Sequence, residues 1–266
     1  MIEQIAHLGL VEDAEIELDR AALEIAALDH PHADLPRRLA VLEQITDRLL
    51  ARAPTARTTG EQAEALADVL AVEFGFEGDS ETYDDPANAD LIEVIDRRRG
   101  LPVALAILYV ALARRVGWVA HALNTPHHVL VGIGQPKSLL IDPFNCGALV
   151  GRERLASLLM TAEGRLNAVA SEQVAPMANR AVLVRLLMNQ ATRAEQARRL
   201  DRAAAVLARV TTVAPAHSLG WWERARLERA LGEVAAARCS LSAMLETTRD
   251  PDLRGRVTRA LEALAE

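Results

Sequence analysis

Aromatic residues are scarce in this sequence: they make up 3% of its 266 residues, although 50% of the chain is hydrophobic. The hydrophobic core must therefore consist mainly of Ala, Leu and Val. Ala and Leu carry the smallest penalties for helix formation, so this composition favours closely packed helices. A chain of this length can form the core of one large domain or of two smaller ones.

Basic residues are outnumbered, since the formal net charge is -7 and the isoelectric point is about 5.6. A protein that binds nucleic acid needs an excess of Lys and Arg on one surface for its phosphate contacts. We therefore expect no nucleic-acid partner, and we interpret the acidic balance as a feature of a soluble surface.

The sequence also lacks a secretory signal and a membrane-length apolar run. Its first residues have neither the basic region nor the apolar region of a signal peptide. The longest uncharged apolar run, Val103 to Ala113, is too short to cross a bilayer. Two cysteines far apart, Cys146 and Cys239, are typical of a reducing compartment. We expect a cytoplasmic protein without a membrane partner.

Groups of potential metal ligands are missing as well. No pair of His or Cys residues has the H-x-x-x-H or C-x-x-C spacing of a zinc site. The acidic residues between positions 79 and 85 do not follow the order of an EF-hand loop. We expect neither a metal nor a cofactor.

Helical periodicity dominates the first part of the chain, where apolar residues recur at helical spacing. An acidic, turn-rich loop over residues 78–88 interrupts it. Proline is favoured in the first turn of a helix and glycine just past its end, which places helix boundaries at Gly100 and Pro102. The expected helices span residues 2–30 (with a break near Gly9), 35–53, 61–74, 88–99 and 102–116.

After Gly117 the pattern changes to short apolar segments separated by turn residues, which is typical of strands. Three strands are expected, over residues 118–123, 128–133 and 138–141. They predict a small antiparallel sheet packed against the helix that begins at Pro102.

From Gly151 onward the chain returns to helical periodicity, with helices expected over residues 176–199, 200–213, 217–231, 233–247 and 251–265. Two of these segments resemble each other. Ala203 and Ala237 are 34 residues apart, and so are Leu207 and Leu241. This spacing equals the period of tetratricopeptide repeats, in which Ala lies where two helices of a pair touch.

An ordered set of short motifs over about residues 20–165 resembles the signature of the SirB-type family of bacterial proteins. The helical tail is similar to the tetratricopeptide region that often follows in that family. The motifs are Tyr83-Asp84-Asp85-Pro86-Ala87-Asn88, Leu91, Val94, Arg98-Arg99-Gly100-Leu101-Pro102, Tyr109, Arg114, Arg115, Gly117, Pro126, His128, Leu130, Val131 and Ile141-Asp142-Pro143-Phe144-Asn145.

This family belongs to the transglutaminase-like superfamily, whose active core resembles that of papain-type cysteine proteases. The resemblance implies a Cys–His–Asp triad. In such a triad a thiolate at a helix N-terminus attacks an amide carbonyl, the histidine acts as base, and the aspartate fixes the tautomer of the histidine.

The resemblance also implies the fold class. We predict an α+β fold that is mostly helical, with the small antiparallel sheet of a transglutaminase-like (papain-like) core and an all-α helical-repeat tail. The SirB-type domain is expected over residues 1–165, with a helical part over 1–75 and the core over 76–165. Tetratricopeptide-like repeats are expected over residues 166–266.

By resemblance, the nucleophile position of the triad corresponds to Pro102, the histidine position to His128 and the aspartate position to Asp142. Proline has no nucleophilic group, so the residue that would perform the chemistry is absent. His128 and Asp142 remain as a residual dyad. They are either a functional pair or a pair that persists because a buried imidazole needs a hydrogen-bond acceptor.

Cys146 is the thiol closest in sequence to this predicted site, four residues after Asp142, where the family pattern has Gly. It follows a strand and does not begin a helix, so no helix dipole is expected to lower its pKa. We expect Cys146 to be a buried or half-buried bystander, and Cys239 to pack within its helix.

The candidates for partner contacts are Tyr83, Arg98, Arg99, Asn145, Trp221 and Trp222. The arginines either bind an acidic group or complement their own helix dipole and the nearby acidic loop. Of the two tryptophans, we expect one in the core and one exposed to a partner.

The leading hypothesis is a catalytically degenerate transglutaminase-like protein that acts as a protein- or peptide-binding or regulatory module. The alternative is an amide hydrolase or acyl transferase, in which His128 and Asp142 serve Cys146 as a relocated nucleophile or activate water. A purely structural scaffold is the third interpretation.

Overall fold

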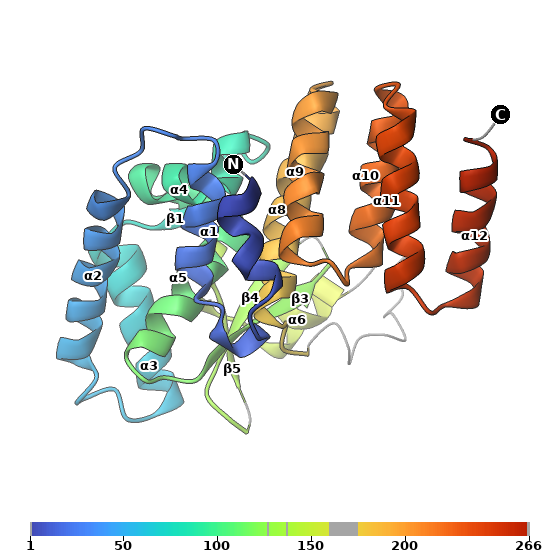
Figure 1. Ribbon diagram of the computed structural model, residues 1–266. Coiled ribbons are helices and arrows are strands. Elements are labelled where there is room, and N and C mark those ends of the chain that lie inside the picture. Colours follow the sequence, from blue (N-terminus) through green and yellow to red (C-terminus); the bar gives the residue numbers. More distant parts are fainter. Residues whose placement is uncertain (1, 127, 137, 160–174, 265–266) are drawn as a thin grey trace. The chain divides into compact units, whose positions relative to one another are not determined.

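The computed structural model describes residues 2–126, 128–136, 138–159 and 175–264. It confirms the predicted fold class: the chain is mostly helical, with small sheets and an all-helical C-terminal region (Figure 1). Contacts divide the chain into a core unit, Glu17–Val182, and a tail unit made of Met1–Ile16 and Leu183–Glu266. The boundary expected near residue 165 lies outside the described residues.

The first helices of the core unit follow the predicted periodicity, and two of them begin at side-chain caps. Asp34 accepts a hydrogen bond from the backbone N–H of Arg37, and Thr58 forms a capping box with Glu61. A short π-helix, Asp68–Glu73, continues directly from the third of these helices. It ends at Phe74, and Gly75 then turns the chain with a φ of 73°. These elements are α1 (Leu18–Ala27), α2 (Leu35–Arg52), α3 (Thr59–Ala67) and η3 (Asp68–Glu73).

The next helix, α4 (Leu91–Arg97), ends earlier than predicted. Arg98 takes the left-handed conformation, with a φ of 62°, so the predicted cap at Gly100 is wrong. Two tertiary contacts hold Arg98 in this conformation: its carbonyl accepts from the N–H of Glu77, and its guanidinium lies 4.7 Å from the centre of the Phe76 ring. Gly100 instead belongs to β2 (Arg99–Gly100), which pairs in parallel with β1 (Glu77–Gly78).

Helix α5 (Pro102–Arg115) is the centre of the core unit. Every residue from Pro102 to Ala113 is buried, which agrees with its uncharged sequence on all faces. Pro102 occupies the first turn, where a missing N–H costs no hydrogen bond. The helix packs against the first two strands of the main sheet.

The main sheet is antiparallel, in the order β3 (Ala120–Thr125), β4 (His128–Ile133), β5 (Leu139–Asp142) and β6 (Ala148–Leu149). The three predicted strands are confirmed. The edge strand β6 was not predicted, because two residues give no alternating pattern. Between β5 and β6 lies a single 3-10 turn, η5 (Pro143–Asn145), and helix α6 (Arg152–Leu159) follows.

The tail unit includes the N-terminal residues. Two 3-10 segments, η1 (Ile2–Gly9) and η2 (Asp13–Glu15), replace the first half of the predicted N-terminal helix. Segment η1 packs against α9, and a Cβ at Gly9 would lie 2.3 Å from the carbonyl oxygen of Thr212. The C-terminal helices are α8 (Asn179–Gln196), α9 (Leu200–Val213), α10 (Ser218–Ala230), α11 (Val234–Thr247) and α12 (Pro251–Glu262), as the periodicity predicted.

None of the helices in the described ranges is long and apolar enough to cross a membrane.

Candidate functional site

His128 and Asp142 meet at one end of the main sheet. His128 is the first residue of β4, and Asp142 is the last residue of β5, the neighbouring antiparallel strand. The register pairs Val131 with Ile141, so His128 and Asp142 are close to diagonal neighbours on one face. The distance from His128 Nε2 to Asp142 Oδ1 is 2.7 Å.

Asp142 is 2% exposed and accepts further hydrogen bonds. Asn145 Nδ2 donates to Oδ2 over 2.5 Å, and the N–H of Phe144 donates to Oδ1 over 3.1 Å. Burial raises the pKa of Asp142, but the hydrogen bonds from His128 and Asn145 outweigh it, so the pKa lies below the ordinary carboxyl value. An ionised carboxylate only accepts, so Nε2 of His128 donates and Nδ1 of the neutral ring carries the lone pair.

Aromatic rings connect this dyad to the acidic loop. The Phe144 ring meets the His128 ring edge-on at 5.9 Å and the Tyr83 ring edge-on at 5.8 Å. A Cβ at Gly78 would lie 2.4 Å from the Phe144 ring, so only glycine permits this approach of β1 to η5. The structure thus brings four of the predicted site residues together: Tyr83, His128, Asp142 and Asn145.

Pro102, at the predicted nucleophile position, is buried at the start of α5. Its neighbours Leu101 and Val103 are 1% and 2% exposed and carry no reactive group. Helix α5 packs against both β4 and η5, the elements that carry His128 and Asn145. The helix start therefore belongs to the same structural core as the dyad, but it offers no nucleophile.

Cys146 is exposed, so the expectation of a buried or half-buried thiol is wrong. It ends η5 in the left-handed conformation, with a φ of 55°, and the chain then continues into β6, the edge strand of the same sheet. Although the residue as a whole is exposed, its sulfur is partly desolvated. This desolvation and the nearby carboxylates of Glu77 and Asp142 raise the pKa of Cys146. Within the described residues the His128 imidazole bonds Asp142 and not this thiol. Cys146 therefore lacks the features of an activated nucleophile.

Cys239 is also exposed, contrary to the prediction that it packs within its helix. Ala237, Ser240 and Leu241 form the buried face of α11, and Cys239 lies off that face.

Tyr109 is a residue of this region that the sequence did not single out for a functional role. It is 0% exposed on α5, and its hydroxyl has no hydrogen-bond partner among the described residues. A Cβ at Gly147 would lie 3.2 Å from this hydroxyl, so the group lies beneath the turn that carries Cys146. Burial, together with the charges of Cys146 and Asp142, raises the pKa of Tyr109. The signals in the sequence were a lone phenol inside an aliphatic helix and the place of Tyr109 among the residues that resemble the family signature.

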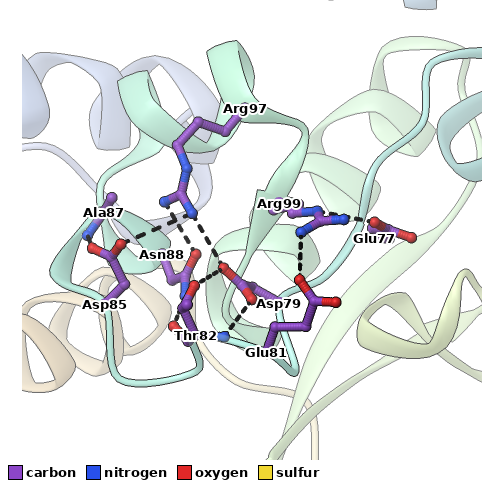
Figure 2. Close-up of polar contacts among 9 residues, drawn as sticks. All are labelled: Glu77, Asp79, Glu81, Thr82, Asp85, Ala87, Asn88, Arg97 and Arg99. Carbon is purple, nitrogen blue, oxygen red and sulfur yellow. Dashed lines mark hydrogen bonds and ion pairs between the residues drawn. The ribbon is translucent and has the colours of Figure 1, made fainter.

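Arg97, the last residue of α4, and Arg99, in β2, pair with carboxylates of the acidic loop and of β1 (Figure 2). Arg97 Nη2 lies 3.1 Å from Asp79 Oδ2, and Arg99 lies 3.0 Å from Glu77 and 3.3 Å from Glu81. The pKa of Asp79 falls to about 2, mainly because the hydroxyl and the N–H of Thr82 donate to it. Arg97 and Arg99 are thus each paired with carboxylates of neighbouring residues.

Arg98 and Arg99 remain candidates for partner contacts, but their settings differ. Arg99 is already paired with two carboxylates. Arg98 is partly buried over Phe76, and this burial lowers the pKa of its guanidinium.

Trp221 and Trp222 lie on α10 in the tail unit, and both are partly buried. Trp221 Nε1 donates to the carbonyl of Pro215 over 2.8 Å. Trp222 packs against the apolar cluster of α10, α11 and α12, with the Arg256 guanidinium 5.0 Å from its ring centre.

In the described part of the chain no three His, Cys, Asp or Glu side chains are grouped so that they could hold a metal ion.

Comparison with known proteins gives one family match. The family described as "Transglutaminase-like superfamily" matches residues 37–188. A UPF0162 protein of Xylella fastidiosa (strain 9a5c) is 27% identical over 255 residues, which cover 92% of this chain and 91% of that protein. A UPF0162 protein of Pseudomonas aeruginosa is 27% identical over 248 residues, covering 93% and 91%. Among solved structures, a crystal structure of menin is similar with a TM-score of 0.43 and 14% identity, covering 91% of this chain and 69% of menin.

Proposed function

Because the chain belongs to the transglutaminase-like superfamily, we propose that it is a catalytically degenerate member, of the SirB type, that binds a protein or peptide. One observation carries the proposal. His128 and Asp142, which we assign to the base and the orienting acid of the family triad, are in hydrogen-bond contact at 2.7 Å, while Pro102, which we assign to the nucleophile position, is buried.

The chemistry of the family explains why this combination favours binding. In a thiol mechanism the histidine removes a proton from the nucleophile, and the carbonyl carbon bonds to sulfur. Without a thiol at Pro102, none of the described residues offers His128 a nucleophile in hydrogen-bond contact. What remains is an oriented, hydrogen-bonded dyad next to Phe144 and Tyr83, a surface suited to polar and aromatic contacts.

A water-activating amidase is the second candidate, and the His128–Asp142 hydrogen bond is the observation that favours it. The lone pair on Nδ1 is the acceptor that a general base requires. The version with Cys146 as nucleophile is less favoured, because the pKa of this thiol is raised and Cys146 ends a 3-10 turn instead of beginning a helix.

The tail supports a binding role in the same chain. Ala203 and Ala237, one repeat apart, are both 0% exposed, and Leu207 and Leu241 are 2% and 4% exposed. Equal burial at equal positions is the behaviour of tetratricopeptide-like repeats, which generally present binding surfaces. Both cysteines are free thiols, which is typical of a reducing compartment, so the proposed location is the cytoplasm.

Restoring the nucleophile tests the proposal directly. The variant Pro102→Cys is made in a background with Cys146→Ser and Cys239→Ser, so that it carries a single thiol. Alkylation by iodoacetamide is followed against pH, with and without His128→Ala. We expect the introduced thiol to titrate well below the free value of about 8.5, and this effect to disappear with His128→Ala. Val103→Cys in the same background is the matched control and should not respond to His128.

The unmodified chain is assayed in parallel with a glutamine-containing peptide and a fluorescent primary amine. No transamidation, deamidation or hydrolysis is expected. Turnover that requires His128 would overturn the proposal in favour of the enzyme. A Pro102→Cys protein could fold normally by circular dichroism and still show the same pH dependence of alkylation with and without His128→Ala. That result would show that Pro102 is not the nucleophile position.

A further inference from the structure

Two cavities of the tail unit share Trp222 as a lining residue. The first has a volume of about 230 Å³ and is lined by apolar side chains of α10, α11 and the end of α12, including Leu241, Ala260 and Leu264. Arg229 stands at this cavity, with Arg226 beside it. The walls are thus apolar and the charged groups at this cavity are cationic.

The second cavity has a volume of about 200 Å³ and is lined by Leu219, Met244 and Leu253. Trp222 lines it as well, so one tryptophan contributes to two apolar recesses. Arg256 lies at this cavity and covers the Trp222 ring at 5.0 Å. The lining residues of both cavities come from α10, α11, α12 and the residues just after α12, the helices at the C-terminal end of the chain (Figure 1).

The two adjacent tryptophans have different roles. Trp221 is held by its hydrogen bond to the Pro215 carbonyl and by Arg224, whose guanidinium lies 5.6 Å from its ring centre, and it lines neither cavity. Trp222 lines both. A large aromatic ring shared by two recesses is the residue type that most often dominates binding energy.

The charges at the cavities indicate the sign of the occupant. Arg226 is already bound to Glu195 and Glu223, and Glu223 is the only carboxylate among the residues that line either cavity. Arg229 and Arg256 have no ion pair with any described residue. The side chains that remain available are therefore cationic and are arginines, which bind carboxylates in a bidentate fork.

The composition of the two units differs in the same sense. The tail unit contains 14 arginines, no lysine and 14 acidic residues, whereas the core unit contains 23 acidic residues against 16 basic ones. The core unit therefore repels an acidic partner segment, and the tail unit as a whole does not.

We propose that this surface, defined by Trp222 and its two cavities with Arg229 and Arg256, binds an acidic peptide segment of a partner protein, with one apolar side chain in each cavity. The inference rests on the proposed binding function and names the class of partner. Nucleic acid fits less well, because two apolar recesses offer nothing to phosphates.

The probe is a pool of synthetic peptides, each with two apolar residues separated by acidic residues in varied number. Two matched pools replace every Asp and Glu by Asn and Gln, or by Lys. Each pool is incubated with the full-length chain, and retained peptides are identified by mass spectrometry, which also reports any cleavage or deamidation. We expect retention from the acidic pool alone, with all peptides intact.

The affinity of the best retained peptide is then measured by fluorescence anisotropy. Trp222→Ala should weaken it at least about tenfold, whereas Trp221→Ala, the matched control, should leave it nearly unchanged. Arg229→Gln and Arg256→Gln should each weaken it about two- to fivefold and reduce its salt dependence.

Other outcomes separate this inference from the proposed function. Acidic peptides that bind Trp222→Ala as well as the wild type would overturn the inference and leave a binding module. Cleaved or deamidated peptides would overturn the proposed function itself. Retention of the Lys pool or the amide pool would refute the acidic partner. A self-association that Trp222→Ala abolishes, without peptide retention, would show a second copy as the occupant and refute it too.

Discussion

Asp79 Oδ2 accepts a hydrogen bond from Arg97 Nη2 over 3.1 Å, and this pair ties the acidic loop to the last turn of α4. The same carboxylate accepts two hydrogen bonds from Thr82, one from the hydroxyl and one from the N–H. It is 2% exposed. The loop that resembles the family signature is therefore ordered by one buried anion.

Acid stability should depend on Asp79. Its pKa is about 2 in the folded chain, against 3.8 ordinarily. A lowered folded-state pKa contributes stability that is present above pH 3.8 and is lost as the pH falls through about 2. We expect Asp79→Asn to flatten the decline in the free energy of unfolding over this window, measured by urea titration at several pH values. Glu81→Gln, at an exposed side chain of the same loop, is the control and should leave the decline unchanged.

Removing the Tyr109 hydroxyl should not destabilise the protein. The group is fully buried without a partner among the described residues, so its desolvation is not compensated. We expect Tyr109→Phe to leave the free energy of unfolding unchanged or to raise it by about 1 kcal/mol. Tyr109→Ala, which also removes the ring, should cost about 3–5 kcal/mol. If Tyr109→Phe lost more than about 1 kcal/mol, the hydroxyl would have to hold a hydrogen bond in solution.

Cys146 should react as an ordinary or less acidic thiol. Burial and two nearby carboxylates raise its pKa, so little thiolate exists near neutral pH. In a Cys239→Ser background, we expect iodoacetamide to modify Cys146 slowly at neutral pH and faster only as the pH approaches the raised pKa. His128→Ala should not alter this profile. A profile shifted below the free value of about 8.5, and dependent on His128, would support the relocated-nucleophile enzyme.

The repeat interpretation predicts matched sensitivity at Ala203 and Ala237, which are both 0% exposed and one repeat apart. Added methyl groups overpack a close helix contact, so Ala203→Val and Ala237→Val should each cost about 1–3 kcal/mol in thermal unfolding. Ala205→Val, on an exposed face of α9, should stay within about 0.5 kcal/mol of the wild type. Strong destabilisation at one alanine and none at the other would show that the two positions are not equivalent.

Local pattern predicted most of the secondary structure of this chain. Side-chain periodicity is a property of short segments, so it located α2, α5, the three main strands and the C-terminal helices. Pro102 and the uncharged run after it predicted a buried helix whose first turn lacks a nucleophile. The pairing of His128 with Asp142 came from resemblance, and the antiparallel register supplies its geometry.

The sequence by itself determined which segments are helical, which residues carry reactive groups, and that no thiol begins α5. Tertiary structure decided how those groups are placed. Arg98, and not Gly100, turns the chain, because Phe76 and the Glu77 amide bind it. Cys146 and Cys239 are exposed, and η1 packs on α9 across almost 200 residues. Each of these outcomes depends on contacts between segments distant in sequence, and local periodicity contains no information about such contacts.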